Sequence, residues 1–101
     1  MPGQAVPTHE PGSNRFSVSL EGELAVVEYT LGDGVMTIEH TRVPKPLEGR
    51  GIAGALVRAA LDHARAQGLK VRPSCPYADA WMRRHPDYDS LRVDGGGGGG
   101  R

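Results

Sequence analysis

Glycines are concentrated where a loop enters the longest helical segment of the sequence. Residues 48–53 read Glu-Gly-Arg-Gly-Ile-Ala, and Gly54 follows inside the helix. Glycines at such a position let a ligand approach the backbone, and the unpaired N–H groups of a first helical turn attract an anion. This arrangement favours a pyrophosphate group as the ligand. The alternative is that Gly49 and Gly51 only form a tight turn, because short glycine motifs often match by chance.

The same glycines also match the spacing of the dinucleotide-binding fingerprint, Gly49-x-Gly51-x-x-Gly54. That fingerprint directly follows a parallel strand and has an acidic residue about 20 positions later. Here prolines separate the preceding strand from the glycines, and the next strand ends in Arg72-Pro73-Ser74 without an acidic residue. A kinase-type glycine loop is excluded as well, since a helix follows rather than a strand that carries a lysine.

Three strands before this loop must position it. Alternation and β-branched residues predict strands over residues 15–20, 24–30 and 35–43. Glu21-Gly22 and residues 31–34 supply tight turns, so the three strands are expected to form an antiparallel meander. Helical spacing of apolar residues then predicts a helix over residues 51–67, which Gly68 ends.

Beyond the long helix, the pattern predicts a fourth strand over residues 69–74, a short helix over 77–85 and a last short strand over 88–93. The helical crossover makes the fourth strand parallel to the third. The expected fold class is therefore α+β with a mixed sheet: a three-stranded antiparallel meander, then helix, parallel strand and short helix. Trp81 is expected to lie in the core of this domain.

The glycine loop resembles the coenzyme A-binding signature of the GNAT superfamily of N-acetyltransferases. In that signature a Gln or Arg, two residues, a Gly, one residue and a Gly or Ala open the helix. Gly51 and Ala53 match, whereas Glu48 stands where the family has Gln or Arg, and we expect its carboxylate to point outward. Further motifs, among them His40-Thr41 and Cys75-Pro76-Tyr77, extend the resemblance over residues 23–91 to the small YjdJ-like branch of GNAT domains.

This resemblance implies acetyl-CoA as the acetyl-donor cosubstrate and an N-acetyltransferase that transfers the acetyl group to a primary amine. The branch lacks the usual helices over the acceptor site, which suits an exposed amine on a protein or peptide. The residues expected to bind the cofactor are Val43, Gly49, Arg50, Gly51, Ile52, Ala53 and Gly54. The alternative function is a module that binds acetyl-CoA without turnover, as a sensor does.

The resemblance also implies that the third and fourth strands separate where the thioester lies, which selects as candidate catalytic residues Glu39, His40, Cys75 and Tyr77. Strict alternation places Glu39 and His40 on opposite faces, with His40 beside Met36 and Ile38. His40 is either a base, since histidine titrates near neutral pH, or a half-buried side chain bonded to the backbone. Glu39 is either a second such group or a solvated strand residue.

The other two candidates follow the fourth strand. Cys75 is either an acetyl-accepting nucleophile or a small apolar residue that lines the pocket. Tyr77 can protonate the leaving thiolate, or its ring can pack under the short helix.

Composition limits the partners. The chain has 101 residues and a formal net charge of zero, which argues against nucleic-acid binding. We expect one folded domain over residues 14–93 between disordered tails, 1–13 and 94–101, that are rich in proline or glycine. No apolar run is long enough for a membrane span, and the N-terminus lacks a signal-peptide pattern, so a cytoplasmic location is expected. A domain this small is marginally stable, and we expect a monomer or weak homodimer.

Overall fold

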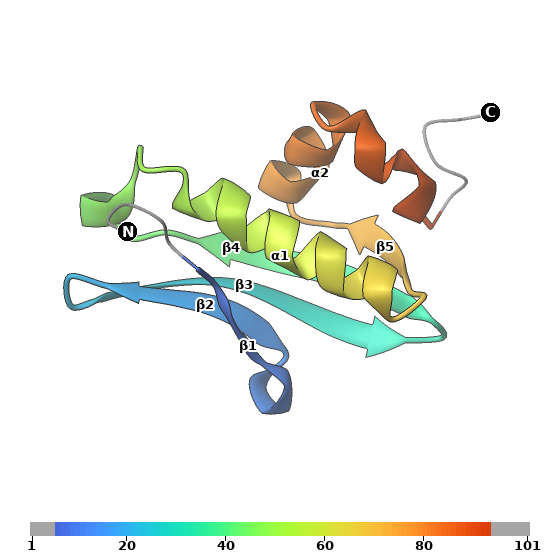
Figure 1. The fold of residues 1–101 in the computed structure, drawn as a ribbon, viewed down its shortest axis with the longest axis horizontal. Coiled ribbons are helices and arrows are strands. Elements are labelled where there is room, and N and C mark those ends of the chain that lie inside the picture. Colours follow the sequence, from blue (N-terminus) through green and yellow to red (C-terminus); the bar gives the residue numbers. More distant parts are fainter. Residues whose placement is uncertain (1–5, 94–101) are drawn as a thin grey trace.

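In the computed structural model, which describes residues 6–93, a five-stranded sheet runs in the order β1-β2-β3-β4-β5. Neighbouring strands are antiparallel except β4 and β5, which are parallel. Helix α1 crosses one face of the sheet. Helix α2, which follows β5 along the chain, lies beside α1 (Figure 1). The elements are β1 (Thr8–Glu10), β2 (Arg15–Leu20), β3 (Glu23–Gly32), β4 (Val35–Arg42), α1 (Ile52–Ala66), β5 (Lys70–Pro73) and α2 (Pro76–Arg83).

Two tight turns produce the meander of β2, β3 and β4. Glu21 and Gly22 both have positive φ angles, 54° and 77°, and so do Asp33 and Gly34, 56° and 76°. Two consecutive positive φ angles match the right-handed twist of the flanking strands and join them by a two-residue hairpin. The predicted meander and the parallel fourth strand are therefore confirmed.

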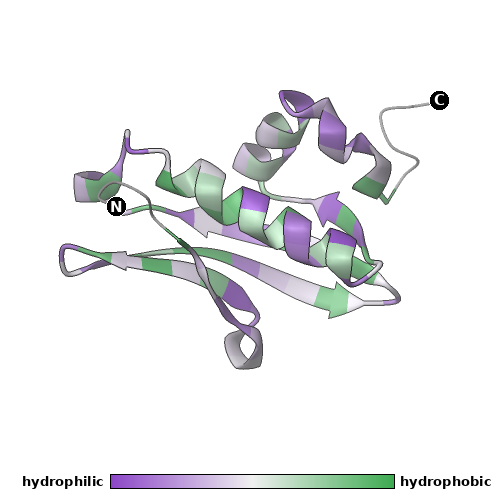
Figure 2. Ribbon diagram, in the orientation of Figure 1, coloured by the Kyte–Doolittle hydropathy of each residue, from purple (hydrophilic) through white to green (hydrophobic). Residues whose placement is uncertain are grey.

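Helix α1 covers the sheet with its apolar face, as its residue spacing predicts. Its buried residues are Ile52, Leu56, Val57, Ala60, Leu61 and Ala64. They join a core that includes Val27 of β3, Met36 of β4 and Val71 of β5, all without exposed surface. Hydrophilic and hydrophobic segments alternate along α1 (Figure 2), which is typical of a helix with one face on a sheet.

The edge strand β1 lies inside the segment 1–13 that was expected to be a disordered tail. Thr8–Glu10 pairs with β2, and His9 stacks on the ring of Phe16 with 4.2 Å between centroids. The Nε2 atom of His9 lies 2.7 Å from the hydroxyl of Tyr29. A histidine therefore anchors this strand, which a search for large apolar residues does not reveal. Residues 1–5 and the expected tail 94–101 lie outside the described residues.

A 3₁₀ helix over Pro86–Leu91 replaces the last strand expected over residues 88–93. Tyr88 and Leu91 are the buried residues of this segment, and their spacing of three fits the 3₁₀ period. A strand would bury alternate residues instead. In the part of the chain that the structure describes, an isolated bridge between Arg92 and Val71 is all that continues the sheet here.

The contacts of His9 predict that the stability of the fold falls in weak acid. Burial, and then the nearby ring of His63 on α1, lower the pKa of His9 from its ordinary value of 6.5. The neutral ring is thus favoured in the folded state, so its stabilisation is complete above pH 6.5 and is lost as the pH falls towards the lower folded pKa. Melting temperatures at pH 7.5 and 5.5 should show this loss. His9→Phe keeps an aromatic ring at this position and should reduce this drop in melting temperature. A drop of unchanged size in the variant would contradict the assignment to His9.

Candidate functional site

The loop between β4 and α1 holds an open helix N-terminus. Leu47, which is fully buried, fixes the loop to the core, and Gly49 and Gly51 follow with φ angles of 82° and 78°. Gly51 is the N-cap of α1 and provides no capping side chain. A Cβ atom added at either glycine would meet no heavy atom within 4 Å. The N–H groups of the first turn are therefore free of a side-chain cap, and the space in front of them is open.

A cleft of about 280 Å³ lies at this helix start. Its lining includes six of the seven residues expected to bind the cofactor: Val43, Gly49, Gly51, Ile52, Ala53 and Gly54. Tyr77, a candidate catalytic residue, also lines it, and 37% of this residue is exposed. The cleft thus combines a polar backbone rim with an apolar wall and one hydroxyl group. Glu48 lines the cleft as well and is an exposed residue.

Arg50 is the one residue expected to bind the cofactor that does not line the cleft. Its guanidinium donates two hydrogen bonds to the carboxylate of Glu21, at 2.7 and 3.0 Å. These hydrogen bonds hold the pKa of Glu21 below its ordinary value and raise the pKa of Arg50. The pair connects the β2–β3 turn to the loop, which sequence spacing does not indicate.

Strands β4 and β5 separate beside the cleft. Their pairing ends at Ile38 and Pro73, and the backbone N–H of Cys75 then donates to the carbonyl oxygen of Ile38 at 3.0 Å. Strand β4 continues to Arg42, and among residues 6–93 no strand pairs with it on this side beyond Ile38. Cys75 is only 5% exposed, and its Sγ lies 3.4 Å from the Oγ1 of Thr41. Thr41 was not among the candidates, although it follows His40 directly in the sequence. Strand alternation places the side chains of Thr41 and His40 on opposite faces of the sheet.

A β-bulge determines where Glu39 and His40 point. Tyr29 of β3 pairs with Ile38, but Glu28 pairs with His40, so Glu39 is an extra residue in β4. The bulge reverses the alternation after Ile38 and puts His40 on the face of Glu28, away from α1. The carboxylate of Glu39 accepts a hydrogen bond of 3.0 Å from Thr30, whose side chain lies on this same face.

The expectation that Glu39 and His40 face opposite sides is therefore wrong, and so is the grouping of His40 with Met36 and Ile38. Met36 and Ile38 are buried under α1, whereas His40 is exposed on the opposite face. An inserted residue moves every later side chain of a strand to the other face. The four candidates are thus divided, with Cys75 and Tyr77 on the helix side and Glu39 and His40 on the other.

The chain resembles known proteins over most of its length. The family model described as GCN5-related N-acetyl-transferase matches residues 15–91. The chain belongs to this family. Among its relatives is Protein NATD1 of Mus musculus, 36% identical over 81 residues, which cover 77% of this chain and 74% of the relative. Protein NATD1 of Homo sapiens is 35% identical over 81 residues, or 77% of this chain and 72% of the relative.

A solved structure has a similar fold over most of the chain. The solution structure of a GCN5-like protein from Staphylococcus aureus superposes with a TM-score of 0.69 at 27% identity, covering 92% of this chain and 91% of the other. The resemblance to the GNAT superfamily and the predicted GNAT-like α+β fold are thereby confirmed. Membership of the GCN5-related family implies the use of acetyl-CoA.

Membrane-spanning helices and metal-binding clusters are both absent from residues 6–93. No helix in this range is long and apolar enough to cross a membrane. Within the same described range, no group of three or more His, Cys, Asp or Glu side chains is arranged to hold a metal ion.

Proposed function

We propose that this protein is an acetyl-CoA-dependent N-acetyltransferase that transfers the acetyl group to a primary amine. The observation that carries the proposal is the uncapped start of α1, which faces an open cleft beside the gap between β4 and β5. Partial positive charge at a helix start suits the pyrophosphate of coenzyme A, and the gap offers the thioester a path between two strands. Family membership supports the same cosubstrate.

Apart from the Glu48 carboxylate, the lining of the cleft fits this cosubstrate. Gly49 and Gly51 leave the space that a pyrophosphate needs, and the backbone N–H groups of Ile52, Ala53 and Gly54 can donate to its oxygens. Val43 supplies an apolar wall for the pantetheine arm. In this proposal the Tyr77 hydroxyl, which is partly exposed in the cleft, protonates the departing thiolate.

The amine would reach the thioester from the face of the sheet away from α1. Glu39 and His40 lie on that face, next to the point where β4 leaves β5. An exposed imidazole there can take the proton that an ammonium must lose before it attacks, and the Glu39 carboxylate can hold the cationic amine. Cys75 is buried against Thr41 on the helix side and does not line the cleft, so we assign it to the core beside the cleft and propose direct transfer.

A titration followed by an acceptor screen tests this function. A cofactor at about a hundred times its dissociation constant should stabilise the fold by about 2.7 kcal/mol, seen as a higher melting temperature. Release of free coenzyme A in the presence of peptides or small amines should follow. No shift in melting temperature at millimolar acetyl-CoA would reject the proposal. Binding without turnover on any amine would instead favour a module that senses acetyl-CoA.

A further inference from the structure

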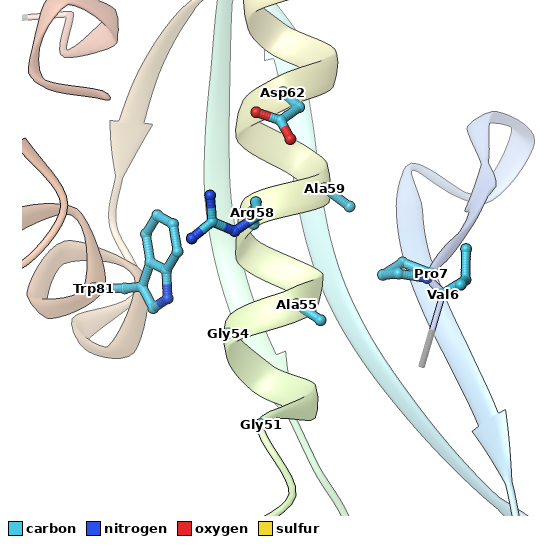
Figure 3. A pocket seen from close by; sticks show the side chains of 9 residues that line it. All are labelled: Val6, Pro7, Gly51, Gly54, Ala55, Arg58, Ala59, Asp62 and Trp81. Carbon is cyan, nitrogen blue, oxygen red and sulfur yellow. The ribbon is translucent and has the colours of Figure 1, made fainter. Parts of the chain in front are cut away.

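A second and larger cavity runs along the outer side of α1. It encloses about 550 Å³ and lies between α2 on one side and the segment before β1 on the other. Trp81 forms one wall and Val6 and Pro7 the other, with the side chains of α1 between them (Figure 3). Gly51 and Gly54 line both this outer groove and the cleft at the start of α1. A long ligand can therefore occupy both without leaving the surface.

Arg58 is the cationic side chain of the outer groove. It points from α1 towards Trp81 (Figure 3), with its Cζ 5.2 Å from the indole ring centroid and 5.9 Å from that of Tyr88. One guanidinium nitrogen donates to the Tyr88 hydroxyl at 3.3 Å. The ion pairs found within residues 6–93 do not include Arg58. Aromatic rings thus hold the guanidinium in place, and its positive charge is available to an anion.

The floor of the outer groove suits a flat ring. Gly54, Ala55 and Ala59 are the small residues of α1 that line it, so a planar group can lie close to the helix. Gly54 also lets the two helices approach, because a Cβ there would be 3.1 Å from the indole nitrogen of Trp81. Arg58 follows Gly51 by seven residues, which is about 10 Å along a helix.

Asp62 adds a negative charge one turn beyond Arg58. Its carboxylate accepts a hydrogen bond of 2.7 Å from the hydroxyl of Tyr88. Burial, and then this hydrogen bond, raise the pKa of Tyr88, so the hydroxyl remains protonated and keeps donating. Asp62 opposes an anion in the outer groove, and removing its charge should have an effect opposite to that of removing Arg58.

We propose that the outer groove binds the 3′-phosphorylated adenosine end of coenzyme A, and that Arg58 pairs with the 3′-phosphate. This inference rests on the proposed function, because it assumes that the pyrophosphate lies at the start of α1. It assigns to Arg58 the discrimination between coenzyme A and dephospho-coenzyme A, which differ only in that phosphate. A charge-assisted hydrogen bond is worth about 1.5 kcal/mol or more, which corresponds to about tenfold in affinity.

Calorimetric titration of the whole chain with coenzyme A and with dephospho-coenzyme A tests the assignment. The parent protein should bind coenzyme A about tenfold more tightly. Arg58→Gln should remove this preference by weakening the binding of coenzyme A without changing that of dephospho-coenzyme A. Asp62→Asn should enlarge the preference. Arg65→Gln is the matched control, because Arg65 also lies on α1 over the Tyr88 ring, 4.6 Å from its centroid, but does not line the outer groove. Its variant should keep the parental preference.

The outcomes separate this inference from the proposed function. Equal affinities of the parent protein for both compounds would overturn the role of Arg58 and leave the proposed function standing. A preference that survives in Arg58→Gln, with an unchanged melting temperature, would overturn it as well. Failure of both compounds to bind the parent protein would overturn both proposals together.

Discussion

Replacing Gly51 by valine is expected to weaken acetyl-CoA binding by about a hundredfold or more. Gly51 has a φ of 78°, and a Cβ on it would project into open space at the start of α1. A branched side chain would fill the space where a pyrophosphate meets the backbone N–H groups. Two lost charge-assisted hydrogen bonds at about 1.5 kcal/mol each account for a hundredfold, which calorimetric titration would measure.

The matched control for this variant is Gly34→Val. Gly34 has a φ of 76° and equally open surroundings, but it lies in the β3–β4 turn, at the other end of β4 from the cleft. Both valines incur a similar backbone strain of about 1–2 kcal/mol, and both should lower the melting temperature. Only Gly51→Val should lose affinity. Normal binding by Gly51→Val would show that the loop is no more than a turn.

The second large effect is expected at His40. If its imidazole is the base for the acceptor amine, His40→Gln should lower kcat by roughly 10²- to 10⁴-fold. Its affinity for acetyl-CoA should remain that of the parent protein, because His40 lies on the face of the sheet away from the cleft. Parallel measurement of Glu39→Gln shows which of the two groups accepts the proton. An unchanged kcat in His40→Gln would remove it from the mechanism.

Replacing Cys75 by alanine is expected to change kcat much less than replacing His40 does. Direct transfer predicts that Cys75→Ala keeps kcat within about tenfold of the parent, a barrier change below about 1.4 kcal/mol. Intact-mass measurement after incubation with acetyl-CoA alone should then show no acetyl group on the protein. An acetylated Cys75 that passes its acetyl group to an amine would reject direct transfer and make the thiolate the nucleophile.

The sequence by itself determined the features that depend on local chemistry. Two-residue turns with glycine define the meander, and apolar spacing defines α1. Gly49 and Gly51 mark an open helix start because the loop needs positive φ angles there. Six of the seven expected cofactor residues therefore line one cleft. Such features need only neighbours along the chain, and these are visible in the residue order.

Only the tertiary structure decided which distant groups meet. The bulge at Glu39 depends on the register with β3, and it moved His40 to the face away from α1. Arg50 pairs with Glu21, 29 positions earlier, instead of facing the cleft. His9 anchors β1 because Phe16 and Tyr29 come together under it. Register and packing depend on contacts between residues far apart in the chain, so the arrangement of these side chains had to be read from the folded molecule.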